Sequence, residues 1–145
     1  MKKIFPLILI CCIIIFLAYI IYERTNKPTA KINGHLFFIE VAKTQTQQEI
    51  GLAKYSKIEK NFAMYFPFTY PDYYGFWMKG MRFPIDIIFI RNKRIVTIFP
   101  NVLARWDYQN YIYKPTQPVD SVLEISAGLS TKYGFKTGDN VIISY

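Results

Sequence analysis

The sequence has few of the residues on which most enzyme chemistry depends. Its 145 residues include only two cysteines, Cys11 and Cys12, and one histidine, His35. Both cysteines lie in an apolar N-terminal segment, so the rest of the chain offers no cysteine nucleophile and no thiolate metal ligand. A Ser-His-Asp triad would have to use His35, and the G-x-S-x-G, H-E-x-x-H, Walker A and G-x-G-x-x-G motifs are absent. These absences exclude the common motif-bearing enzyme classes.

Metal ligands are equally scarce. Met64, Met78 and Met81 are soft ligands that could bind copper(I), but methionine is far more often a filler of apolar cores. We therefore expect no metal site and no cofactor.

A strong charge of one sign is also missing from most of the chain. The net charge is +8 overall, but residues 32–145 carry 13 basic and 9 acidic residues, a net charge of +4 without a basic run. Nucleic-acid binding typically requires a clustered basic surface. We therefore expect no nucleic-acid partner.

One long apolar run is present, Ile4–Tyr22, preceded by Lys2 and Lys3. A helix of this length spans roughly 28 Å, close to the about 30 Å of a bilayer core. No small-residue cleavage site follows it, which favours an uncleaved signal-anchor over a cleaved signal peptide. The leading lysines predict a cytoplasmic N-terminus, and so a single-pass protein whose folded domain is extracytoplasmic. The predicted segments are a transmembrane signal-anchor over 1–22, a tether over 23–33 and a β domain over 34–145.

The remaining chain predicts many short strands. The whole sequence is 52% hydrophobic and 18% aromatic, a composition too apolar for a disordered protein. Apolar runs separated by turn residues indicate a compact β sandwich or barrel with one or two short helices. Thr44 followed by Gln47 predicts a helix N-terminus with a capping box. A two-residue turn at Asn92-Lys93 would place lysine at positive φ, so we expect a longer turn there.

The stretch Phe76–Ile90, FWMKGMRFPIDIIFI, places charges among apolar side chains. If it forms a simple hairpin, Trp77, Lys79 and Asp86 share one face and Lys79 lies diagonal to Asp86, at roughly 7 Å. Such a pair is either a structural ion pair or part of a ligand site. For a ligand site we expect Asp86→Ala to lower stability by less than about 1.5 kcal/mol.

The segment Asn101–Asn110 is rich in aromatic residues, including Trp106, and predicts an irregular loop. A loop of this kind is either a lid over a site or a flap on the core.

Short motifs follow one another along the chain, namely Gly51-Leu52, Ala63–Phe68, Phe76–Lys79, Pro84–Ile90, Val122–Ile125, Ala127-Gly128 and Gly138-Asp139. In this order they resemble the motifs of the uncharacterised DUF192 family, over roughly Leu36–Ile143. The resemblance implies a β sandwich or barrel of jelly-roll type, often preceded by an export or anchor segment, and implies no activity. The chain departs from the family pattern at Gln48, often arginine, at Ala53, where the pattern has methionine, and at Gly80-Met81, commonly Asn-Thr.

Three functions fit these observations. The first is a membrane-tethered binding or accessory module of the cell envelope, with Trp77, Lys79, Asp86 and Glu124 as ligand-binding candidates. Its partners would be the membrane, through residues 4–22, and a small polar ligand or an envelope protein. The second is an enzyme that uses Asp86 or Glu124 as general acid or base and Lys79 as an electrostatic stabiliser. The third is a structural envelope protein without a ligand. The sequence assigns no catalytic residue.

Overall fold

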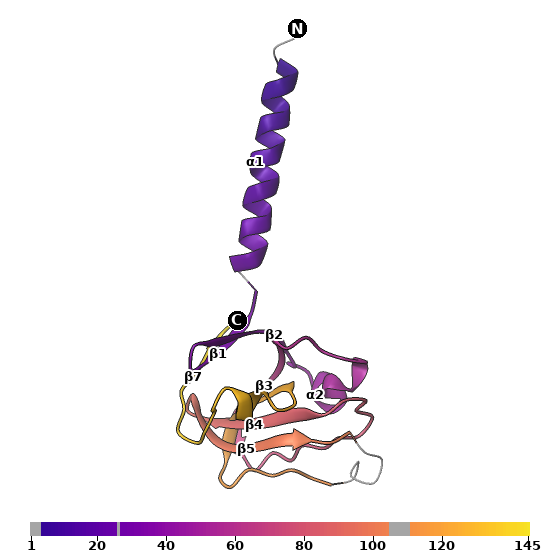
Figure 1. The fold of residues 1–145 in the computed structure, drawn as a ribbon, viewed down its shortest axis with the longest axis vertical. Helices are drawn as coiled ribbons and strands as arrows, with labels where there is room; N and C mark the ends of the chain where they lie inside the picture. The colour runs from indigo at the N-terminus through magenta and orange to yellow at the C-terminus, as the bar shows by residue number, and fades with distance from the viewer. Residues whose placement is uncertain (1–3, 26, 105–110) are drawn as a thin grey trace.

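The structure is a computed structural model that describes residues 4–25, 27–104 and 111–145. The helices and strands follow in chain order (Figure 1). They are α1 (Ile4–Thr25), β1 (Thr29–Ile32), β2 (His35–Val41), α2 (Gln45–Ile50), the 3₁₀ helix η1 (Gly51–Lys54), β3 (Phe62–Asp72), β4 (Ile85–Arg91), β5 (Arg94–Val102), β6 (Val119–Ser126), α3 (Leu129–Lys132) and β7 (Val141–Ser144).

The N-terminal helix α1 extends away from the β domain (Figure 1). Within the described residues, no helix is both long and apolar enough to cross a membrane. The prediction of a membrane-anchored, single-pass protein with an extracytoplasmic domain is therefore wrong. Lys2 and Lys3, on which the orientation rested, lie outside the described residues.

The described strands form one seven-stranded sheet in the order β5-β4-β6-β3-β2-β1-β7. It curls so that β1, β2 and β7 lie across from β4 and β5 (Figure 1). The chain is mainly β with short helices, as predicted, but the predicted jelly-roll-like sandwich or barrel behind a transmembrane helix is wrong. The physical reason is that a period-2 apolar pattern shows which face of a strand is buried, but does not show which strand lies beside it.

Two connections depart from a simple antiparallel sheet. β2 pairs with β3 in parallel, with Ile39 opposite Ala63, so the chain between them must cross over. That crossover contains α2 and η1. β1 lies between β2 and β7, antiparallel to both. It falls within 23–33, the stretch predicted to be a tether, so the folded domain includes part of that segment.

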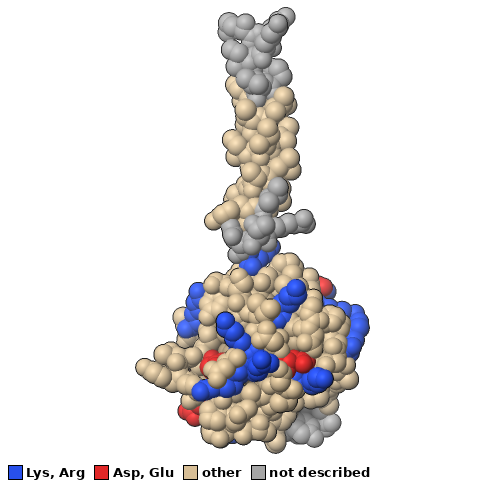
Figure 2. Space-filling model, turned by 90° about the vertical axis from the view of Figure 1, so that its left-hand side faces the viewer, with Lys and Arg blue, Asp and Glu red and all other residues tan. Residues whose placement is uncertain are grey.

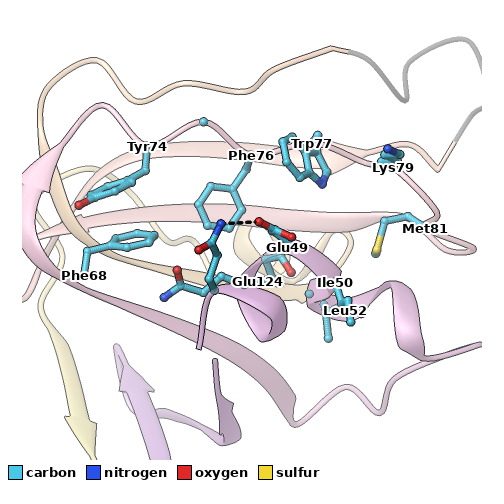
Figure 3. Close-up of a pocket in the computed structure, with 14 residues that line it drawn as sticks. Glu49, Ile50, Leu52, Phe68, Tyr74, Phe76, Trp77, Lys79, Met81 and Glu124 are labelled. Carbon is cyan, nitrogen blue, oxygen red and sulfur yellow. Dashed lines mark hydrogen bonds between the residues drawn. The ribbon is translucent and has the colours of Figure 1, made fainter. Parts of the chain in front are cut away.

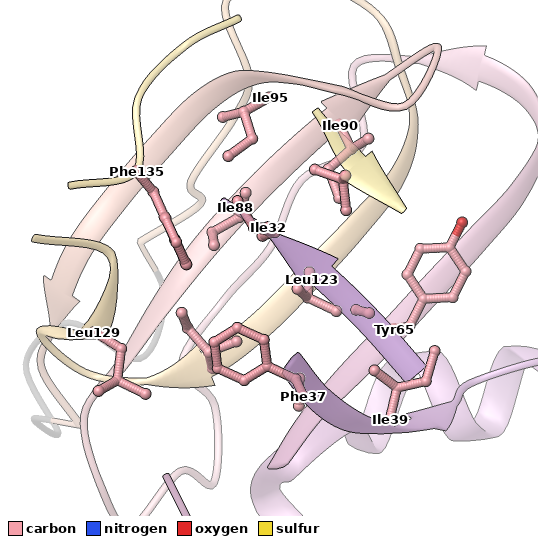
Figure 4. Packing of buried hydrophobic residues seen from close by; sticks show 14 residues of the cluster. Ile32, Phe37, Ile39, Tyr65, Ile88, Ile90, Ile95, Leu123, Leu129 and Phe135 are labelled. Atoms are coloured by element: carbon pink, nitrogen blue, oxygen red, sulfur yellow. The ribbon is translucent and has the colours of Figure 1, made fainter. Parts of the chain in front are cut away.

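Both faces of the central strands are buried, each by a different apolar cluster. On β4, Ile88 and Ile90 face the inside of the curl, where Phe37 and Leu123 also lie (Figure 4). Ile85, Ile87 and Phe89 alternate with them and belong to a second cluster on the other face. Because side chains alternate across a strand, the buried apolar residues of β4 are divided between two interiors. The second interior is the one that borders the candidate site.

The turn between β4 and β5 is shorter than expected. Arg91 pairs directly with Arg94, which leaves Asn92 and Lys93 as a two-residue turn with φ of 49° and 60°. The main-chain NH of Asn92 donates to Asp120 at 2.7 Å, and this contact helps to hold a lysine at positive φ. Trp106, the centre of the predicted lid or flap, lies outside the described residues.

Figure 2 shows one face of the domain, with groups of basic side chains and acidic side chains beside them. The face in view therefore carries mixed charge among many uncharged residues. The expectation of no nucleic-acid partner stays a prediction.

Candidate functional site

A pocket of about 180 Å³ lies beside the second apolar cluster, between the α2–η1 segment and the chain that follows β3 (Figure 3). Its walls combine aromatic and aliphatic side chains with a few polar ones. The lining residues are Gln45, Gln48, Glu49, Ile50, Gly51, Leu52, Phe68, Tyr74, Gly75, Phe76, Trp77, Lys79, Met81 and Glu124.

Helix α2 is fixed at its start by the capping box expected from the sequence. The Thr44 hydroxyl accepts from the main-chain NH of Gln47 at 3.2 Å, and the Gln47 side chain accepts from the NH of Thr44 at 3.0 Å. Gln48 then ties the helix to the sheet, since its Nε2 donates to the carbonyls of Ala42 at 3.1 Å and Pro67 at 3.2 Å. This wall of the pocket is therefore held rigidly.

The helix ends at Gly51, whose φ of 51° and ψ of −139° are accessible essentially only to glycine. This conformation turns the backbone toward the sheet. A Cβ at this position would lie 3.6 Å from Phe66 and 3.7 Å from Oε2 of Glu124. Gly51 therefore brings the main chain close to the Glu124 carboxyl.

Glu124 lies on β6, between Met64 of β3 and Ile87 of β4. Its side chain is only 4% exposed, and within the described residues its Oε2 has no hydrogen-bond partner. Burial disfavours the charged form and raises the pKa of Glu124 to about 8. The carboxyl is therefore mostly protonated at neutral pH, and it borders the pocket with an unused oxygen.

Four aromatic residues, Phe68, Tyr74, Phe76 and Trp77, form another part of the pocket lining. Phe68 and Tyr74 stack with ring centroids 3.6 Å apart, and Phe76 meets Phe68 edge-on at 6.4 Å. Phe76 is held in place by main-chain hydrogen bonds with Tyr113 at 2.9 and 2.7 Å. Trp77 is 41% exposed, so much of its indole is free for contact. These rings form a wall suited to stacking.

Charged side chains stand at the exposed part of the lining (Figure 3). Glu49, on α2, accepts a hydrogen bond from Gln45 Nε2 at 2.8 Å. Lys79 lies in the segment that follows β3, shortly after Trp77. Both charged residues are exposed to solvent. The rim thus offers one negative and one positive charge, while the buried part offers a carboxyl.

Asp86 lies elsewhere, and the predicted Lys79–Asp86 ion pair is wrong. Asp86 sits opposite Ile125 on β6 and faces the first apolar cluster, whereas Glu124 faces the second. Its two oxygens accept four hydrogen bonds, all within 2.8 Å, from the main-chain NH groups of Asn101, Gly128 and Ser130 and from the Ser130 hydroxyl. Residues 76–84 do not form the hairpin on which the pairing depended, because Phe76 bridges to residue 113 instead.

The structure therefore brings together three of the four predicted site residues, Trp77, Lys79 and Glu124, and separates Asp86 from them. Sequence reasoning missed Glu49 and Tyr74. Glu49 carried a weak signal, since it falls in the short helix predicted after Thr44.

Metal binding finds no new support in the described part of the chain. No group of three or more histidine, cysteine, aspartate or glutamate side chains converges there. Met64 and Met78 are buried in the second apolar cluster, where they act as core residues.

Comparison with solved structures identifies relatives of the same fold. One is a protein of unknown function from Novosphingobium aromaticivorans DSM 12444, with a TM-score of 0.73 and 31% identity over 79% of this chain and 83% of that one. Another, from Sinorhizobium meliloti 1021, is described as a candidate transcription regulator, with a TM-score of 0.74 and 28% identity over 81% of this chain and 93% of that one. No curated protein matches.

The family comparison covers almost the whole domain. The model of DUF192, described as "Uncharacterized ACR", matches residues 28–143. This range begins just before β1 and ends in β7, so it includes the whole of β1 to β6 and most of β7. The chain belongs to the DUF192 family, a family of unknown function.

Proposed function

We propose that this protein is a binding module for a small ligand, and that the ligand occupies the pocket between α2 and the Trp77 segment. The observation that carries the proposal is the Glu124 carboxyl, buried beside a pocket with one oxygen unpartnered. A buried polar atom without a hydrogen bond costs about 1–3 kcal/mol, and native structures rarely keep one without a reason. A ligand that bonds to this oxygen would recover that free energy.

The walls support the same proposal. Ligand pockets are typically apolar and aromatic with a few polar groups that fix orientation. Here Phe76 and Trp77 supply ring surface, while Glu124 supplies the buried polar group. Lys79 and Glu49, on the rim, would contact parts of the ligand that stay in water. Asp86 has no part in this site.

A second candidate function is acid–base catalysis by Glu124. The favouring observation is its pKa of about 8, because a general acid or base works best when its pKa is near the operating pH. Lys79 could then stabilise charge that develops near the rim, although it is exposed and therefore screened.

The binding proposal can be tested with small aromatic probes. In the full-length Trp106→Phe protein, Trp77 is the only tryptophan, so its fluorescence reports on the pocket. We expect benzyl alcohol or benzylamine to change this fluorescence saturably. Backbone NMR shifts should move most strongly near Gly51 and Phe76.

The matched comparison uses two exposed aromatic residues. Trp77→Ala, measured by NMR, should weaken probe binding severalfold, whereas Tyr70→Ala should not, because Tyr70 is 76% exposed and does not line the pocket. If neither probe shifts the pocket resonances, or if both variants behave alike, the protein is not a binding module of this kind. A purely structural role would then remain.

A further inference from the structure

Resting on the proposed function, we propose that the ligand is an organic cation, an amine whose ammonium group lies against the Glu124 carboxyl beside the aromatic wall. The pocket has one free buried acceptor and several aromatic faces, whereas several of its hydrogen-bond donors are already used. Each part of this imbalance is visible in the contacts of the lining residues.

Three donors of the pocket lining are engaged within the protein. Both contacts of Gln48 Nε2 are with main-chain carbonyls. The main-chain NH of Gly51 donates to the carbonyl of Gln47, and the Tyr74 hydroxyl donates to the carbonyl of Tyr70 at 2.7 Å. Apart from the protonated Glu124 carboxyl, the Trp77 indole and the exposed Lys79 ammonium group, a ligand anion or carbonyl would therefore find few donors in the pocket.

The acceptor, in contrast, is free. Oε2 of Glu124 is buried, borders the pocket and has no hydrogen-bond partner within the described residues. A carboxylate is an acceptor only, and its best partner in a desolvated site is a charged donor. An ammonium group supplies three N–H donors and the charge that a buried carboxylate needs.

The aromatic wall favours the same class of ligand. A cation within about 6 Å of an aromatic face is attracted by the ring quadrupole, with tryptophan the strongest partner. Phe76 and Trp77 present such rings in the pocket that Glu124 also lines (Figure 3). Of the charged lining residues that the structure describes, Glu49 and Glu124 are acidic and Lys79 is basic. Because Lys79 is exposed, solvent screens its repulsion.

Binding of an ammonium group should release a proton. In the free protein the Glu124 carboxyl keeps its proton at neutral pH because burial raises its pKa to about 8. When the ammonium group binds, the O–H bond of the carboxyl breaks, its proton passes to water and the carboxylate pairs with the cation. The other titratable groups of the lining are Glu49 on α2, and Tyr74 and Lys79 in the segment after β3.

The test compares benzylamine with benzyl alcohol, its neutral counterpart, on the full-length protein. We expect benzylamine to bind at least about tenfold more tightly, which corresponds to one ion pair reinforced by aromatic contact. Its affinity should rise up to about tenfold per pH unit between about pH 6 and about pH 8. Calorimetry in two buffers with different ionisation heats should show release of close to one proton per ligand.

Glu124→Gln provides the decisive variant because it keeps the side-chain shape and removes the titrating group. In this variant the preference for benzylamine should fall to within about twofold of benzyl alcohol, and its pH dependence should disappear. Glu59→Gln is the matched control, because Glu59 is exposed and does not line the pocket, and we expect it to leave the preference for benzylamine unchanged. Expressing each affinity relative to benzyl alcohol in the same variant removes any general effect on folding.

The two proposals fail in different ways. If benzyl alcohol binds as tightly as benzylamine, or if the preference survives Glu124→Gln, the cation inference is wrong while the binding module stands. If neither probe reaches the pocket, both are wrong.

Discussion

Asp86 and Glu124 are buried carboxyl groups on neighbouring strands, and they face opposite sides of the same sheet. Asp86 is fully buried, and its two oxygens accept four hydrogen bonds. Glu124 is nearly as buried, yet one of its oxygens is unpartnered. The contrast shows that burial alone does not identify a functional carboxylate. The hydrogen-bond partners do, because a fully satisfied group is structural and an unsatisfied one is available to a ligand.

The largest effect should come from Asp86→Ala. It leaves three main-chain NH groups and one hydroxyl without their acceptor, so we expect a loss of at least about 4 kcal/mol in the free energy of unfolding. This reverses the sequence-based expectation of less than about 1.5 kcal/mol. Denaturant unfolding of the full-length protein measures it, with the exposed Asp72→Ala as control. A loss within about 1.5 kcal/mol would show that Asp86 is not the structural member of the pair.

Glu124→Gln should instead change how stability depends on pH. Between about pH 4.5, the ordinary pKa, and about pH 8, the unfolded chain loses this proton while the folded protein keeps it. Wild-type stability therefore falls, relative to Glu124→Gln, by up to about 1.4 kcal/mol per pH unit across this window, and is level on either side of it. Unfolding curves of both proteins across the window test this. A constant difference would mean that the folded state does not hold the proton.

A smaller effect is expected from Thr44→Ala, which removes the N-terminal cap of α2. The loss should be about 1 kcal/mol, the typical contribution of such a cap. Since α2 lies on the Glu124 side of the sheet, a loosened α2 should also flatten the pH dependence that Glu124 causes, without altering the effect of Asp86→Ala. Thr46→Ala, in the first turn of the same helix, is the control, and equal losses in the two variants would contradict a capping role.

The smallest effect is the coupling between Lys79 and Asp86. Because the two lie at separate sites, the losses for Lys79→Ala and Asp86→Ala should add within about 0.5 kcal/mol in the double variant. Chemical unfolding of the four proteins of this cycle provides the measurement. If the double variant clearly recovered stability, the result would support the Lys79–Asp86 ion pair that the sequence suggested.

Local features of the fold could be predicted from the sequence, while long-range pairings could not. The capping box between Thr44 and Gln47 depends on residues three apart, and it forms as expected. The partners of Asp86 come from positions up to 44 residues away, and no local pattern announces them. The simple hairpin assumed for Phe76–Ile90 therefore paired Asp86 with the wrong residue, Lys79.

The site shows the same limit. Trp77 and Glu124 could be named because one lies beside charged residues in an apolar stretch and the other is a glutamate within an apolar strand, where charges are unusual. Trp77 and Glu124 line the same pocket because β2 pairs with β3 in parallel. This pairing places α2 and Gly51 over β6. A pattern of alternating residues carries no information on that pairing.

The pairing of β1 with β7 has a consequence for synthesis of the protein. β1 is among the first segments of the domain to be made, but its partner along one side, residues 141–144, is made after every other strand. Until then Ala30 and Ile32 border an open strand edge, which is a template for pairing with another chain. Folding on the ribosome can therefore assemble the middle of the sheet early, but it cannot close this edge before the last strand emerges.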